Sequence, residues 1–154
     1  MRRTDKEITD PNLLQDILIN SQICRLGLVD NSEAYIVPVN YAFVDGYIYI
    51  HSASEGRKIE ILKRNPKAAF EIEYPSETIR GEIPCKWGTR YRSVMGKGTI
   101  VIDDDIESKK NGFDALMRKY GAEFALVYDE SALAKAVLLK LRIESLTGKQ
   151  SGIW

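Results

Sequence analysis

The feature that most constrains this chain is a series of short segments in which apolar and polar residues alternate. In the first half of the sequence such segments cover residues 23–29, 35–44, 47–51 and 68–74. Alternation with a period of two is typical of β-strands that bury one face. Asp30-Asn31-Ser32 and Asp45-Gly46 separate the first three segments and favour tight turns. These segments therefore predict an antiparallel meander.

Pro38 lies inside the second predicted strand. Because proline has no backbone N–H, it is confined to edge strands and bulges of a sheet. The sequence therefore predicts an edge position, with nearby backbone groups free to face a ligand.

Helical spacing appears in three places. The first predicted helix begins at Asp10-Pro11 and ends near Asn20. The second covers residues 57–64, directly after the third strand. The third follows Asp103-Asp104-Asp105 and ends near Tyr120. Two further strands are predicted at 91–102, where two glycines permit a bulge, and at 136–146. Residues 75–88 are expected to form a long loop or short irregular strands.

About six antiparallel strands with few helices indicate a mainly β fold, a small barrel with flanking helices. At 154 residues, without an internal repeat or linker, the chain is expected to form one domain, residues 1–154. The meander excludes the regular strand–helix alternation of a parallel α/β sheet.

The charges balance, with 22 Lys and Arg against 22 Asp and Glu. This excludes a broad basic face for nucleic acid or anionic membrane. Cys24 and Cys85 are too few for a disulfide scaffold, and a single histidine, His51, excludes metal sites with two histidine ligands, so no metal is expected. No long apolar run follows the basic amino terminus, and we expect a cytoplasmic protein.

The segment HSASEGRK, residues 51–58, carries the chemistry most clearly. It joins serine hydroxyls, a glycine and the cations Arg57 and Lys58 at a helix start, where unpaired N–H groups favour an anion. This pattern predicts a seat for one phosphate group. A solvated turn with ordinary surface charges is the alternative reading of the same residues.

Five segments follow one another along the chain, namely CRLGLV, PVNYAFVDGYIYIHSASEGRKIEILKRNP, AAFEIE, YRSVMGKGTI and LTGK. In this order they resemble the flavin-binding split barrels related to pyridoxamine 5′-phosphate oxidase, and within them the Nim-type 5-nitroimidazole resistance proteins. The resemblance covers most of the chain. It implies a six-stranded antiparallel split barrel that forms a homodimer, with flavin in the cleft between subunits.

The resemblance also assigns residues to the flavin. The backbone of Pro38, Val39, Asn40 and Tyr41 would run beside the isoalloxazine ring, His51 and Ser52 would reach the ring edge or ribityl chain, Arg57 and Lys58 would hold the phosphate, and Arg92 and Ser93 would complete the site. For His51 a positioning role is expected, because hydride chemistry belongs to the flavin. Trp87, Tyr91 and Trp154 are either flavin-covering aromatics or ordinary packing residues.

The chain departs from the oxidase proper on the strand Ile36–Asn40, which lacks the arginine and lysine that the oxidase carries there. The basic and aromatic residues by which the oxidase binds pyridoxal phosphate also have no match in this chain. We therefore expect a flavin-dependent oxidoreductase that reduces nitroaromatic or similar electron-poor molecules, with FMN as cofactor and FAD as an alternative. Two other functions remain open, a non-enzymatic split barrel that binds flavin or haem and an interaction protein with a vestigial site.

Overall fold

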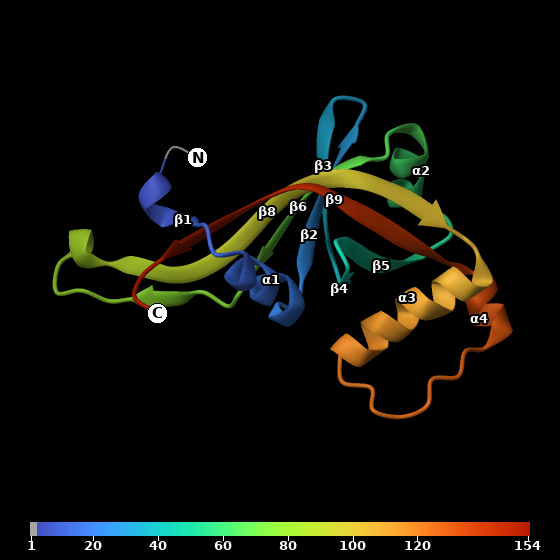
Figure 1. Ribbon diagram of the computed structural model, residues 1–154. Helices are drawn as coiled ribbons and strands as arrows, with labels where there is room; N and C mark the ends of the chain where they lie inside the picture. Colours follow the sequence, from blue (N-terminus) through green and yellow to red (C-terminus); the bar gives the residue numbers. More distant parts are fainter. Residues whose placement is uncertain (1–2) are drawn as a thin grey trace.

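The computed structural model describes residues 3–154 and is dominated by one antiparallel sheet (Figure 1). The strands are β1 (Glu7–Ile8), β2 (Cys24–Asp30), β3 (Glu33–Val39), β4 (Ala42–Val44), β5 (Tyr47–Ala53), β6 (Lys67–Glu73), β7 (Glu77–Ile79), β8 (Gly88–Asp103) and β9 (Ala136–Ser151). Their order in the sheet is β3-β2-β6-β8-β9-β5-β4, with β1 beside β9 and β7 beside β8. The mainly β prediction is confirmed.

The six predicted strands correspond to β2, β3, β5, β6, β8 and β9, and the described part of the chain holds three more, which makes nine. The three additional strands are β1, β4 and β7, each only two or three residues long. β1 and β7 hold too few residues for alternation to be visible in the sequence. β4 is the end of the predicted segment 35–44, which the structure divides into two strands. The long segment after β6 contains β7 and a 3₁₀ turn, η2 (Pro84–Lys86), in agreement with the expected irregular structure.

The meander prediction is also wrong, because β3 and β4 lie at opposite ends of the strand order. The hairpin of β2 and β3 forms as expected, but the chain leaves the sheet edge at Asn40 and Tyr41. Tyr41 is fully buried, and its hydroxyl donates a hydrogen bond of 2.8 Å to the carbonyl of Leu18. This nonlocal anchor carries the chain to the other edge, where β4 pairs with β5.

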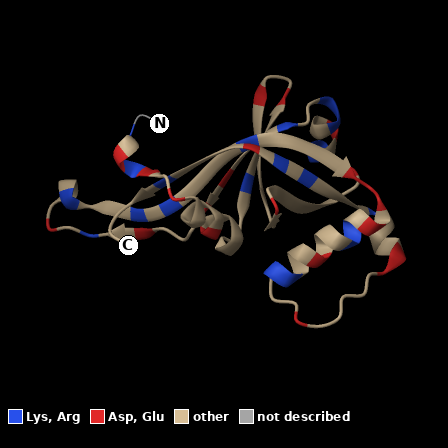
Figure 2. Cartoon of the chain, viewed as in Figure 1, with Lys and Arg blue, Asp and Glu red and all other residues tan. Residues whose placement is uncertain are grey.

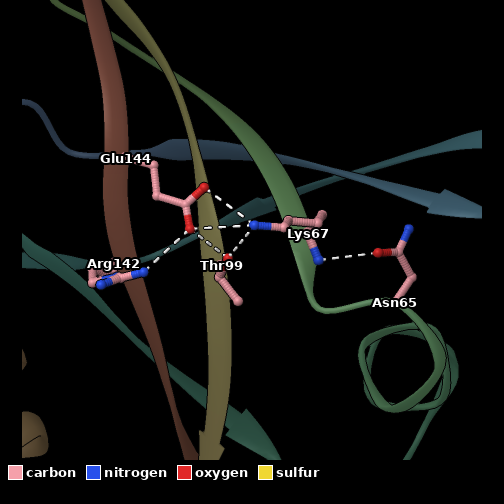
Figure 3. A network of polar contacts seen from close by, with 5 residues as sticks. All are labelled: Asn65, Lys67, Thr99, Arg142 and Glu144. Carbon is pink, nitrogen blue, oxygen red and sulfur yellow. Dashed lines mark hydrogen bonds and ion pairs between the residues drawn. The ribbon is translucent and has the colours of Figure 1, made fainter.

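β8 and β9, the two longest strands, pair with each other along most of their length, with a bulge between Lys97 and Gly98. A Cβ atom at Gly98 would lie 2.0 Å from the carbonyl oxygen of Arg142, so this close approach requires glycine. The predicted bulge is confirmed. Beside it, β6, β8 and β9 are joined by side chains, because the Lys67 Nζ donates to Thr99 at 2.8 Å and pairs with Glu144 at 3.3 Å (Figure 3).

The helices are α1 (Pro11–Asn20), α2 (Arg57–Arg64), α3 (Ile106–Lys119) and α4 (Glu130–Ala134), with a 3₁₀ turn, η1 (Thr4–Lys6), before β1. α1, α2 and α3 are confirmed, while the short α4 was not predicted. The Asp10 carboxylate accepts from the backbone N–H of Asn12 and Asp105 does the same for Ser108, so both aspartates are N-caps at the helix starts that the sequence predicted.

The main hydrophobic core lies between the sheet, α1 and α2, and a second cluster lies under α3 and α4 at one end of the sheet (Figure 1). A Cβ atom at Gly112 of α3 would lie 2.4 Å from the Leu138 side chain, so glycine lets α3 approach β9 closely. The buried Lys109 Nζ donates to Asp104 at 2.7 Å and to the carbonyl oxygens of Leu133 and Ala136. These bonds tie α4 and the start of β9 to α3.

Lysines and arginines are interspersed with aspartates and glutamates along the sheet and the helices (Figure 2). This interspersion along the backbone agrees with the balanced composition. Among residues 3–154, no helix is long and apolar enough to cross a membrane.

Candidate functional site

His51 and Lys58 lie close together where β5 ends and α2 begins. The His51 side chain is exposed and lines a cavity, whereas Ser52, its neighbour on the strand, faces the opposite side and is 6% exposed. The Lys58 side chain is half-buried and forms no hydrogen bond or ion pair with any other residue in the range 3–154. An unpaired cation therefore stands beside the single histidine of the chain.

The start of α2 has the geometry expected of an anion seat. Gly56 is its N-cap, with φ of 108°, a conformation that favours glycine, and no side chain caps the helix. The N–H groups of the first turn are therefore free of side-chain partners, and they favour an anion.

Arg57 is paired with a carboxylate of the chain and is not free to bind a ligand. Its Nε donates to Asp30 Oδ2 at 3.0 Å, and its guanidinium lies 5.1 Å from the centre of the Tyr35 ring. Asp30 also accepts from Arg64 at 2.7 Å. The phosphate seat predicted from Arg57 and Lys58 thus has one free cation, Lys58, and one that must leave a carboxylate to reach a ligand.

Two side chains of this region have displaced pKa values. Burial, followed by the charge of Lys58, lowers the pKa of His51 from its ordinary value. Burial also lowers the pKa of Lys58. His51 is consequently held in its neutral form, in which one ring nitrogen donates a hydrogen bond and the other accepts one.

The strand predicted to run beside a ring, Pro38 to Tyr41, divides between surface and core. Pro38 lies in β3, an edge strand, which confirms the edge prediction. Asn40 is exposed and lines the same cavity as His51. Tyr41, in contrast, has no exposed surface, and its backbone N–H donates to the Tyr120 hydroxyl at 3.2 Å. A ligand in the cavity meets Asn40 and not the Tyr41 ring.

The cavity has a volume of about 380 Å³ and lies between β5 and the α3–α4 segment. Asn40, His51, Tyr120, Tyr128 and Asp129 supply its polar atoms. Its apolar walls are Phe113, Leu116, Met117, Ala132, Leu133 and Ala136. The His51 and Phe113 rings meet edge to face with centroids 5.0 Å apart, which orients the imidazole.

The remaining predicted site residues, Arg92 and Ser93, lie at the other end of the sheet. Arg92 pairs with Gln150 of β9, whereas His51 pairs with Leu138 of the same strand. Twelve residues of β9 separate these two positions, a path of about 40 Å at the usual rise of a strand. Arg92 donates to the Gln150 side chain, and its guanidinium lies 4.2 Å from the centre of the Trp154 ring.

One chain therefore brings together Asn40, His51 and Lys58, places Arg57 beside them in an ion pair, and keeps Arg92 and Ser93 apart. The sequence interpretation missed the cavity walls contributed by α3 and α4. The spacing of Phe113, Leu116 and Tyr120 marks one face of a helix, but nothing in it reveals which strand that face covers.

The aromatic and cysteine candidates lie outside the cavity. Trp87 is 52% exposed and donates from its indole nitrogen to the Gly81 carbonyl, whereas Trp154 packs on Arg92. Cys24 is buried and Cys85 is exposed, and they do not form a disulfide. Burial raises the pKa of the Cys24 thiol to about 12, so it is unreactive.

A family model described as pyridoxamine 5′-phosphate oxidase matches residues 10–150. Among solved structures, a candidate 5-nitroimidazole antibiotic resistance protein of Bacteroides thetaiotaomicron is 27% identical with a TM-score of 0.84, over 93% of this chain and 85% of that chain. The FAD and haem binding protein of Mycobacterium smegmatis is 22% identical with a TM-score of 0.85, over 97% and 75%. A flavocytochrome of Azotobacter vinelandii is 17% identical with a TM-score of 0.81, over 99% and 72%. None of the curated proteins searched matches the chain.

Proposed function

Because this chain belongs to the pyridoxamine 5′-phosphate oxidase family, whose model spans residues 10–150, we propose that it is a homodimeric flavoprotein that reduces small electron-poor molecules. Its cofactor is FMN, bound between the subunits. Its substrates are nitroaromatic compounds of the 5-nitroimidazole kind, and its electrons come from a nicotinamide nucleotide or a protein donor. The likeness to the Bacteroides protein supports this substrate class.

One observation carries the proposal, namely the unpaired Lys58 at the uncapped start of α2, next to His51 and an apolar cavity. A phosphate at this helix start gains the free N–H groups and the Lys58 charge. Lys58 is half-buried, and burial penalises its charge. A bound anion offsets that penalty, so the arrangement fits a phosphate ester better than an empty surface turn.

The flavin supplies the transfer of electrons, and the protein supplies position. Lys58 and the start of α2 hold the phosphate, and Arg57 adds a second contact when it leaves Asp30. His51, neutral and oriented by Phe113, donates or accepts one hydrogen bond at the edge of the ring or to the substrate. The apolar side chains of α3 and α4 would reduce the contact of water with the reacting centre.

The separation of Arg92 and Ser93 from His51 supports the proposed dimer. A path of about 40 Å along β9 is far longer than one extended flavin mononucleotide. If Arg92 and Ser93 contact the cofactor, as the family resemblance implies, they do so from a second copy of the chain. The proposed site therefore needs Asn40, His51 and Lys58 from one subunit and Arg92 with Ser93 from the other.

Purification followed by absorption spectroscopy and FMN titration tests the proposal. We expect a yellow protein whose flavin is identified as FMN by chromatography, and oxidation of a reduced nicotinamide nucleotide when a 5-nitroimidazole is added. A colourless protein that does not bind added FMN would contradict it. Flavin binding without any reduction of nitroaromatic compounds would support a flavin-binding protein and contradict the proposed enzymatic activity.

A second candidate is a binding protein for haem, because the neutral His51 imidazole faces the cavity. Two structurally similar proteins are described as a haem-binding protein and a flavocytochrome. Titration with haemin separates the candidates. A Soret shift that is lost in His51→Ala favours haem, and FMN binding without a Soret shift excludes it.

A further inference from the structure

The cavity between β5 and the α3–α4 segment differs in chemistry from the phosphate seat at α2. The seat offers a cation and free N–H groups, whereas most lining residues of the cavity are apolar. At about 380 Å³ it has the size of a small-molecule pocket. It therefore suits a different group from the phosphate.

Most polar atoms of the cavity already have partners inside the chain. The Tyr120 hydroxyl donates to the Gln22 carbonyl at 2.6 Å and accepts from the Tyr41 N–H. The Tyr128 hydroxyl donates to Asp114 at 2.7 Å. These two hydroxyl groups are therefore already paired within the chain and are not free donors for a ligand.

Two lining side chains remain without hydrogen-bond partners among residues 3–154, and both are uncharged. They are the Asn40 amide and the His51 imidazole, whose pKa is lowered by burial and by Lys58. One charged lining residue is negative. The Asp129 carboxylate caps α4 by accepting from the Ala132 N–H at 3.0 Å, and its hydrogen bonds to Ser131 and Ala132 lower its pKa.

We propose that this cavity is a substrate pocket selective for uncharged planar rings, with Phe113 and Leu116 as its apolar walls and Asn40 and His51 as its hydrogen-bonding groups. This deepens the proposed function, because it defines which electron-poor molecules reach the flavin. An anionic substituent inside the pocket would lie near Asp129, and the cation beside His51, Lys58, is outside the lining and is assigned to the phosphate. A buried charge without a partner is strongly unfavourable.

The test uses 4-nitrobenzyl alcohol and 4-nitrobenzoate, which share a ring and differ in charge. His51 is the single histidine, so its imidazole NMR resonance reports occupancy with or without flavin. We expect the alcohol to shift this resonance. In flavin-free Lys58→Met, where the nearby cation is removed, 4-nitrobenzoate should bind about tenfold more weakly than the alcohol, or worse. Equal or tighter binding of the carboxylate would overturn the proposal.

The location is tested by filling the pocket. Ala132 of α4 lines the cavity, whereas Ala134 of the same helix is exposed and does not. We expect Ala132→Phe to weaken binding of 4-nitrobenzyl alcohol about tenfold, because the new ring takes the space of the ligand, and Ala134→Phe to leave it unchanged. Equal behaviour of the two variants would overturn the assignment.

FMN titration of the same variants separates this inference from the proposed function. Unchanged FMN affinity in Ala132→Phe supports a pocket for substrate, and loss of FMN would mean that the flavin ring itself occupies the cavity, which overturns the proposal. A wild-type protein that binds the alcohol and never binds FMN would support the pocket and contradict the flavoenzyme.

Discussion

The two ends of the long β8–β9 ribbon differ in the surroundings of their charged side chains. At the end that carries α3 and α4, His51 and Lys58 stand beside an apolar cavity, and burial lowers the pKa of both side chains. At the other end, Arg92 donates to Gln150 and stacks on Trp154 in a polar, open region. The resemblance assigned residues from both ends to one flavin site.

The difference indicates that each end of one chain holds an incomplete half of the proposed flavin site. The first end has the enclosure, the neutral imidazole and a free cation, but few charged groups. The second end has an arginine with aromatic support, but no apolar cavity around it. In a symmetric dimer, each site takes the first end of one subunit and the second end of the other. The following variants test that division.

Lys58→Met should have the largest effect. We expect FMN affinity to fall about tenfold to a hundredfold, because a charge-assisted hydrogen bond contributes about 1.5–3 kcal/mol. Arg57→Met should cost less, since Arg57 gives up its bond to Asp30 to reach the ligand. Fluorescence titration measures both. Riboflavin, which lacks the phosphate, is the control ligand, and an equal loss of riboflavin binding would show that Lys58 does not act on the phosphate.

Lys109→Met should lower the stability of α3, α4 and the start of β9, and not that of the region around Arg92. The Lys109 Nζ is bonded to Asp104 and to the Leu133 and Ala136 carbonyl oxygens, and its loss leaves buried carbonyl groups unpaired, at a cost of about 1 to 2 kcal/mol in unfolding free energy. Denaturant unfolding measures the total, and hydrogen exchange should rise in α3 and α4 but not around Arg92. Lys110→Met, a partly exposed neighbour whose ammonium pairs with Glu107 of the same helix and with no buried carbonyl group, is the matched control.

Lys119→Met tests the cost of charge at the pocket end. The Lys119 Nζ has no hydrogen-bond partner among the described residues and lies 3.2 Å from the centre of the Tyr41 ring. Burial lowers the pKa of Lys119 to about 8. Because the unfolded chain then binds the proton more readily, wild-type stability should rise with pH from about 8 toward the ordinary lysine value.

In Lys119→Met this rise should disappear, and at pH 7 the variant should be more stable by about 1 kcal/mol, since the ring offsets only part of the penalty. Thermal or denaturant unfolding between pH 7 and 10 provides the measurement. Lys63→Met, at an exposed lysine of α2, should keep the wild-type pH dependence. A less stable Lys119→Met would mean that the contact with Tyr41 outweighs the burial.

The smallest effect is expected at His51. In an NMR titration Lys58→Met should raise the pKa of His51, because it removes a positive charge that disfavours protonation. Lys86→Met, at an exposed lysine of η2 outside the proposed site, should leave the pKa where it is. An equal shift in Lys86→Met would show that the effect of Lys58 on His51 is not local.

The sequence predicted the local parts of the fold well. Asp10-Pro11 marked the start of α1, the glycines of β8 marked the bulge, and alternation marked β5 and β6. It could not predict the break between β3 and β4, because that break depends on burial of Tyr41 against Leu18. Nor could it predict α4, which has five residues and no measurable periodicity.

The same limit applies to the site. The segment HSASEGRK predicted two cations at a helix start, and Arg57 and Lys58 do lie at the start of α2. The pairing of Arg57 with Asp30 joins residues 27 positions apart, so nothing in the local sequence signals it. The cavity depends on how α3 packs over β5, which the apolar spacing of α3 leaves undetermined. The short stretch between Tyr91 and Val94 gave no sign that it lies far from His51 in one chain.

Subunit complementation tests the shared site directly. Lys58→Glu and Arg92→Glu are co-expressed with different affinity tags, and the heterodimer is purified through both tags. Each homodimer should lose tight FMN binding, while the heterodimer should bind about one FMN per two chains, because one of its two sites takes both wild-type residues. No tight binding in the heterodimer, or no heterodimer at all, would contradict a site built from two copies.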